Sequence, residues 1–132
     1  MENYSLTLEI LEGIYCVCKG LPHHLIDDIL DKSNFFSLTK TCDEVSVVFN
    51  QSLIPDFEEA VYEKDWKVLK VVGPLDFALV GILSNISLLL KNAGISLFVI
   101  STYDTDYILV KESSLQQTIC VLKEGGHIVR PL

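Results

Sequence analysis

The second half of the chain alternates between strand-like and helix-like patterns in one order, and that order restricts the folds it can adopt. Residues 66–72, WKVLKVV, alternate as a strand and stop at Gly73-Pro74. The segment 79–93 carries apolar residues at helical spacing, and Gly94 is a typical helix end. Two β-rich runs, a second helix and a final strand follow at 95–102, 107–111, 114–124 and 127–130. The order β-α-β-β-α-β predicts a ferredoxin-like α+β unit.

The first half shows a shorter version of this pattern. Two strands, a helix and two further strands are expected at 6–11, 14–19, 23–32, 35–41 and 44–49. The polar connector 51–65 contains Pro55 and an acidic cluster, and we expect a short helix around 57–62 within it. We place the module boundary in this connector, with an N-terminal module at 1–63 and a C-terminal module at 64–132.

A comparison of the two halves indicates an internal repeat. Residues 38–48, LTKTCDEVSVV, and 100–110, ISTYDTDYILV, both place a polar turn between apolar runs, with Glu44 opposite Asp106. Two ferredoxin-like units in tandem explain this pattern better than one irregular domain. We therefore expect an α+β fold of two βαββαβ units, the first of them abbreviated, with antiparallel sheets and helices on one face.

Charge and hydropathy argue against several classes of partner. The 132 residues include 10 basic and 18 acidic ones, which gives a net charge of −8. Because phosphate binding depends on lysine and arginine, this balance disfavours nucleic acid and anionic membrane surfaces. The first ten residues lack a signal-peptide pattern, and polar residues interrupt the most apolar segment, 77–94. That segment falls short of the roughly 20 apolar residues of a membrane span, so we expect a cytoplasmic protein.

The cysteines leave two interpretations open. Cys16 and Cys18, followed by His23 and His24, form either part of a zinc site or a pair of buried thiols on one strand face. Paired zinc cysteines are commonly separated by two to four residues, and a second pair is absent from the sequence. We expect reduced thiols, no metal ion and no cofactor.

The stretch 101–110, STYDTDYILV, sets Asp104 and Asp106 close together between two apolar runs. The two carboxylates have four interpretations: an acid–base pair, metal ligands, a hairpin turn, or the polar wall of a small-molecule site. The sequence has no nucleophile elbow, Gly-rich phosphate loop or H-E-x-x-H motif, so we expect no enzyme and no catalytic residue. We expect Asp104 to form the turn and Asp106 to face a ligand.

Several of these segments together resemble an ACT domain. The resemblance is carried by Gly73-Pro74-Leu75-Asp76-Phe77, Gly81-Ile82-Leu83, GIS at 94–96 and ISTYDTDYILVKE at 100–112. They are most similar to the ACT domains of the CASTOR arginine-sensor family and its bacterial tandem-ACT relatives. FFSLTKTCDEVSVV, at 35–48, is similar to the first ACT unit of that group. The resemblance implies βαββαβ modules that pair side by side and bind small effectors, most often amino acids, between modules.

The resemblance also implies a set of ligand-binding residues. They lie in the turn after the first strand, at the start of the following helix and in the polar hairpin: Asp76, Phe77, Val80, Gly81, Ile82, Thr102, Tyr103 and Asp106. The arginine site of the sensors has acidic residues just after the phenylalanine, whereas this chain has Ala78 and Leu79. The resemblance therefore predicts an amino acid-like ligand without specifying which one.

The chemistry of these residue types suits an amino acid. A helix start offers free N–H groups to a carboxylate, and Gly81 lets a ligand approach the backbone, although close helix–sheet packing also explains a glycine. Asp76 caps the helix or contacts the ligand. Asp106 accepts hydrogen bonds from an ammonium group, Thr102 offers a hydroxyl and Tyr103 a ring wall. We expect a homodimeric regulatory sensor, with a regulated protein partner. The alternative is a dimerisation or interaction module without a ligand.

Overall fold

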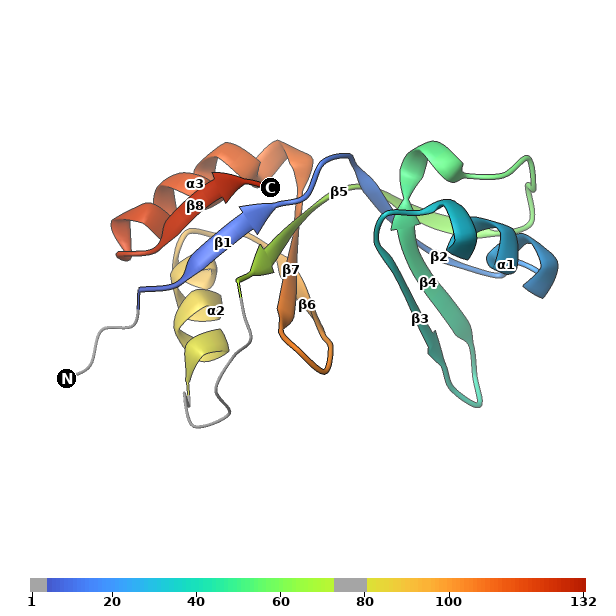
Figure 1. Ribbon diagram of the computed structural model, residues 1–132, viewed down its shortest axis with the longest axis horizontal. Helices are drawn as coiled ribbons and strands as arrows, with labels where there is room; N and C mark the ends of the chain where they lie inside the picture. The colour runs from blue at the N-terminus through green and yellow to red at the C-terminus, as the bar shows by residue number, and fades with distance from the viewer. Residues whose placement is uncertain (1–4, 73–80) are drawn as a thin grey trace. The chain divides into compact units, whose positions relative to one another are not determined.

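The computed structural model describes residues 5–72 and 81–132 and has an α+β fold (Figure 1). The chain divides into two compact units. The N-terminal unit is Gly13–Trp66, and the C-terminal unit combines Met1–Glu12 with Lys67–Leu132. The expected modules, 1–63 and 64–132, follow chain order, whereas the first strand groups with the C-terminal unit. Sequence order does not set this grouping, because strands pair across any separation along the chain.

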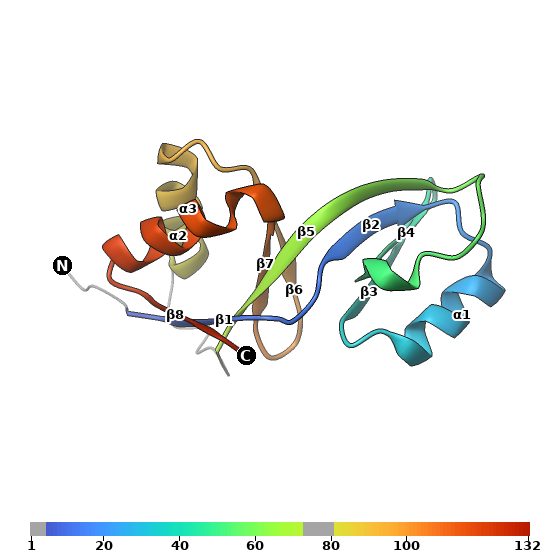
Figure 2. The same ribbon diagram turned by 90° about the horizontal axis from the view of Figure 1, so that it is seen from above.

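The C-terminal unit has a mixed sheet in the order β8-β1-β5-β7-β6. Its strands are β1 Thr7–Ile10, β5 Val61–Val71 (its second half), β6 Leu97–Ser101, β7 Asp106–Lys111 and β8 Ile128–Pro131. Strand β1 runs antiparallel to β5, with Leu8 opposite Val71, and parallel to β8, with Leu8 opposite Val129. β1 and β8 lie side by side in both views (Figures 1 and 2). The sheet is mixed because β1 and β8 run parallel, whereas the pairs β1–β5 and β6–β7 are antiparallel.

Two helices, α2 (Ile82–Asn92) and α3 (Leu115–Glu124), cover this sheet on one side (Figure 2). Ile86 and Leu90, one turn apart on α2, and Leu122 on α3 are fully buried. They pack with Leu8, Leu69, Val71, Ile108 and Val110 of the strands in one core. This pattern is the apolar helix stripe that the sequence predicts. Within the part of the chain that the structure describes, no helix is long and apolar enough to cross a membrane.

The N-terminal unit has the sheet order β3-β4-β2-β5 and one α-helix. Its elements are β2 Tyr15–Lys19, α1 His23–Lys32, β3 Phe36–Lys40, β4 Val45–Asn50, the 3-10 turn η1 Gln51–Leu53 and the first half of β5. Ile26 and Ile29 of α1 pack on Cys16, Val47 and Phe49. The predicted helix at 57–62 is wrong: β5 begins at Val61, where extended Val61 and Tyr62 pair with Lys19 and Cys18.

The two hairpins β3–β4 and β6–β7 have the same geometry. Lys40 pairs with Val45 in the first, and Ser101 pairs with Asp106 in the second. A 3-10 turn follows each hairpin directly, as η1 or as η2 (Glu112–Ser114). The predicted alignment of the repeat is therefore wrong by one residue, since Asp106 matches Val45 and not Glu44. Because side chains alternate between the faces of a strand, a shift of one residue exchanges those faces.

Candidate functional site

The start of α2 is one half of the predicted site. Asp76, Phe77 and Val80 lie outside the described residues. Gly81 precedes the helix with a left-handed backbone (φ 90°), and its carbonyl accepts a hydrogen bond from the N–H of Asn85 at 2.8 Å. A Cβ at this glycine would meet no described atom within 4 Å. The positive φ therefore explains the glycine, and close helix–sheet packing does not.

The β6–β7 hairpin is the other half of the predicted site, and Asp106 is the first residue of its second strand, β7. It shares a strand face with Ile108 and Val110, which are buried in the core beneath the helices. The side chain is half-buried, and its Oδ1 accepts a short hydrogen bond from the hydroxyl of Ser101. A half-buried carboxylate on the helix-covered face is suited to accept hydrogen bonds from an ammonium group.

The other predicted hairpin residues have different surroundings. Thr102 and Tyr103 are exposed, and the Tyr103 side chain has 93% of its surface accessible. The Thr102 hydroxyl donates to the carbonyl of Thr105 at 3.0 Å and accepts from the Thr105 N–H at 3.3 Å, so it closes the turn. Asp104 lies exposed in this turn, as expected. Of the predicted hairpin residues, Asp106 is half-buried, whereas Thr102 and Tyr103 are exposed.

Thr105 is a structural residue of the hairpin that the sequence did not single out. It is buried, and its hydroxyl donates to the carbonyl of Val71 at 2.6 Å. This bond ties the turn of the β6–β7 hairpin to the end of β5. The signal was its position: Thr105 alternates with Tyr107 and Leu109 on the face opposite Asp106, and Leu109 is fully buried.

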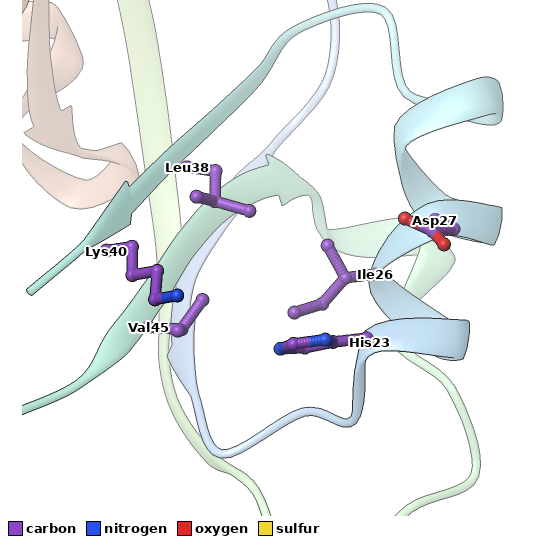
Figure 3. A pocket seen from close by; sticks show the side chains of 6 residues that line it. All are labelled: His23, Ile26, Asp27, Leu38, Lys40 and Val45. Carbon is purple, nitrogen blue, oxygen red and sulfur yellow. The ribbon is translucent and has the colours of Figure 1, made fainter.

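The N-terminal unit has a cavity of about 260 Å³ between α1 and its hairpin (Figure 3). Six residues line it: His23, Ile26, Asp27, Leu38, Lys40 and Val45. Lys40 and Val45 are the hairpin pair that matches Ser101 and Asp106 in the C-terminal unit. None of these six residues was predicted as a ligand contact; a repeat in the register of the backbone pairing would have matched Val45 with the predicted Asp106, and Lys40 with Ser101.

The two thiols of β2 belong to the core of the N-terminal unit. Burial raises the pKa of Cys16 to about 12 and that of Cys18 to about 11. Both groups are therefore protonated at neutral pH, which is the form that binds metal ions poorly. Among residues 5–72 and 81–132, no group of three His, Cys, Asp or Glu side chains is arranged to hold a metal ion.

Comparison with solved structures shows the fold. Protein Atu0741 from Agobacterium tumefaciens is 30% identical, with a TM-score of 0.82, and the match covers 96% of this chain and 92% of that one. A protein of unknown function from Vibrio cholerae, VC0802, described as a possible transport protein, is 20% identical with a TM-score of 0.72. That match covers 92% of this chain and 91% of that one. The regulatory subunit of aspartate kinase from Thermus thermophilus is 7% identical, with a TM-score of 0.66 and coverage of 94% and 99%.

Family models divide the chain at nearly the same place as the two units. Residues 61–124 match the ACT domain model, and residues 13–56 match a model for the N-terminal domain of a protein family. No curated protein sequence matches the chain. The fold is therefore the α+β, ferredoxin-like fold of ACT regulatory domains. The chain belongs to the same family as the Agobacterium protein and carries an ACT domain in residues 61–124.

Proposed function

We propose that the protein is a regulatory sensor that binds a small amino acid-like ligand through its ACT domain. The observation that carries the proposal is the half-buried Asp106 carboxylate, held by Ser101 on the helix-covered face of the hairpin. The ligand ammonium would bind Asp106, and its carboxylate would bind the helix start at Gly81. Asp76, Phe77 and Val80 complete the predicted site, together with Ile82, Thr102 and Tyr103.

The N-terminal unit is proposed to be a second, abbreviated ACT module in tandem with the first. Three observations support this: its strand order β3-β4-β2-β5, its single helix α1, and a hairpin whose pairing and following 3-10 turn match those of the ACT domain. The burial pattern of β4 also equals that of β7. Homodimer formation, ligand binding at an interface between modules and a regulated protein partner complete the proposal. The regulatory subunits of aspartate kinase from Thermus share the fold.

The Asp106→Ala variant tests the site, with Asp104→Ala as its matched control. Both variants remove one carboxylate from the same hairpin, but Asp104 lies exposed in the turn. Titration calorimetry with the amino acid that stabilises the parent protein measures the dissociation constant of each variant. We expect binding to be lost in Asp106→Ala and kept in Asp104→Ala. Equal binding by Asp106→Ala and the parent would place the ligand elsewhere.

A module that acts only through protein contacts is the alternative function. In that case no amino acid would stabilise the parent protein, and both hairpin variants would behave alike. An oligomeric state that persists without any ligand and is unchanged by all twenty amino acids would favour this alternative.

A further inference from the structure

We propose that the cavity of the N-terminal unit binds a small aliphatic monocarboxylate. Its volume of about 260 Å³ lies just below the roughly 300–1,000 Å³ of sites for drug-sized ligands. A ligand with a short branched hydrocarbon body and one charged end is of the right size. The proposal concerns Gly13–Trp66 and does not depend on the site proposed for the ACT domain.

The apolar part of the cavity is formed by one helix residue and two strand residues. Ile26 of α1 is buried against the core, Leu38 of β3 has 47% of its surface exposed, and Val45 of β4 is half-buried. Figure 3 shows Leu38, Val45 and Ile26 around the same space. An exposed leucine beside a cavity offers apolar surface that a hydrocarbon ligand would remove from water, which is favourable.

Lys40, which carries a positive charge, and His23 form the end of the cavity that offers hydrogen-bond donors. In Figure 3 the Lys40 Nζ and the His23 ring point toward each other across the cavity. The ammonium donates charge-assisted hydrogen bonds to a carboxylate, and an imidazole N–H adds a further donor. α1 also begins here, at His23 after Pro22, without a side-chain cap, so its dipole favours a negative charge at the same end.

Asp27, an exposed residue of the lining, disfavours a second negative charge on the ligand. Its carboxylate lies on α1 away from Lys40, with the apolar residues between them (Figure 3). A dicarboxylate or a phosphate ester would bring a second negative charge toward Asp27, which is unfavourable at short range. A ligand with an ammonium group is tolerated at this end but is not required. The shared chemistry is therefore one carboxylate on a small aliphatic body.

The matching place in the ACT domain has the opposite polarity. Ser101 occupies the position of Lys40, and Asp106 occupies that of Val45. A carboxylate end fits Lys40, whereas an ammonium end fits Asp106. The two hairpins therefore favour different chemical groups, although their backbone pairing is the same.

Two-dimensional amide NMR spectra of the full chain test this inference with isovalerate as the probe. Isovaleramide is the uncharged control. A comparison of L-valine with 2-oxoisovalerate shows whether the carboxylate that binds belongs to an amino acid or to an oxo acid. We expect isovalerate to shift signals within residues 23–45, and isovaleramide to leave them unchanged. Lys40→Met should weaken binding roughly tenfold or more, since a charge-assisted hydrogen bond is lost. Lys123→Met, which removes an exposed charge from α3, should bind like the parent.

Several outcomes would overturn the inference. They are the absence of shifts at millimolar isovalerate, equal binding of isovaleramide, or equal affinity in Lys40→Met and the parent. Phosphate or succinate binding as tight as isovalerate binding would contradict the role given to Asp27. Shifts confined to residues 81–106 would instead report the ACT-domain site, so the failure of one proposal is distinguishable from the failure of the other.

Discussion

The Ser101 hydroxyl donates a hydrogen bond to the Asp106 carboxylate, and these two residues are the strand pair that flanks the turn of the β6–β7 hairpin. The corresponding pair in the N-terminal unit is Lys40 and Val45, which lines a cavity. One backbone geometry thus presents an anion in one unit and a cation in the other. Each hairpin is therefore suited to a different charged group of a ligand: a cationic group at Asp106 and an anionic group at Lys40.

Thr105 should contribute to stability through its buried hydroxyl. In Thr105→Val the carbonyl of Val71 loses its hydrogen bond from the side chain, and we expect a loss of about 1–2 kcal/mol in the free energy of unfolding. Thr105→Ser keeps the hydroxyl and is the control, with a smaller loss from the missing methyl group. Urea unfolding measures both. If Thr105→Val has the same free energy of unfolding as the parent protein, the hydrogen bond to Val71 does not stabilise the hairpin.

His127 should make stability depend on pH. The residue is buried, its Nδ1 accepts a hydrogen bond from the Leu6 N–H at 3.1 Å, and its Nε2 lies 3.0 Å from Asn85 Oδ1. Burial lowers the pKa of His127 below its usual 6.5, because the charged form is disfavoured. Below about pH 6.5 the unfolded chain takes up a proton that the folded protein resists. The free energy of unfolding therefore falls as the pH falls, by at most about 1.4 kcal/mol per pH unit.

Urea unfolding at several values between about pH 7.5 and pH 5 checks this prediction, above the range in which most carboxylates titrate. The variant His127→Gln has no imidazole and should show a flatter dependence. Equal slopes in the variant and the parent protein would show that His127 is not the group responsible.

Two of the four thiols should react quickly with a thiol reagent in the folded protein, and the other two should be protected. Cys16 and Cys18 are buried with raised pKa values, whereas Cys42 and Cys120 are exposed. Because the thiolate is the nucleophile, a disulfide reagent should modify two cysteines quickly in the folded protein and the other two only after denaturant is added. Mass spectrometry of the modified peptides assigns them. Rapid modification of Cys16 or Cys18 would contradict the burial of β2.

Asp65 should be sensitive to substitution because of its backbone. It has a left-handed φ of 71°, and among the described residues it is the one non-glycine with a positive φ. It lies where the pairing of β2 with β5 shifts register, and Gln51 binds both its carboxylate, at 2.9 Å, and its N–H, at 2.8 Å. Asn tolerates this conformation, whereas Ala costs roughly 1–2 kcal/mol. Asp65→Ala should therefore unfold at lower urea than Asp65→Asn. Equal midpoints would mean that the backbone relaxes there.

Local pattern predicted those parts of the fold that depend on neighbouring residues. The stripe of Ile86 and Leu90 predicted α2, and the polar turn at Asp104 predicted the β6–β7 hairpin, because periodicity and turn chemistry are local properties. The place of β1 depends on pairing Leu8 with Val71, far along the chain, and no local pattern encodes it. The same reason explains why no local pattern predicts that β1 groups with the C-terminal unit.

The ligand site remains a prediction. Asp106 was identified from its residue type and position, but the repeat was aligned by residue type, with Glu44 opposite Asp106. The backbone pairing instead matches Asp106 with Val45, and this one-residue difference concealed the contrast with Lys40. Thr105 was missed because its alternation with Tyr107 and Leu109 indicates only a buried position, and not the distant carbonyl that its hydroxyl binds.

The central claim, that the ACT domain binds an amino acid-like ligand at Asp106, is tested most directly by thermal unfolding of the parent and Asp106→Ala with each of the twenty amino acids. A ligand at about 100 times its dissociation constant adds roughly 2.7 kcal/mol, which is several degrees for a protein of this size. We predict a selective rise in the midpoint of the parent protein and none in the variant. The absence of a rise with every amino acid at millimolar concentration, or the same rise in both proteins, would contradict the claim.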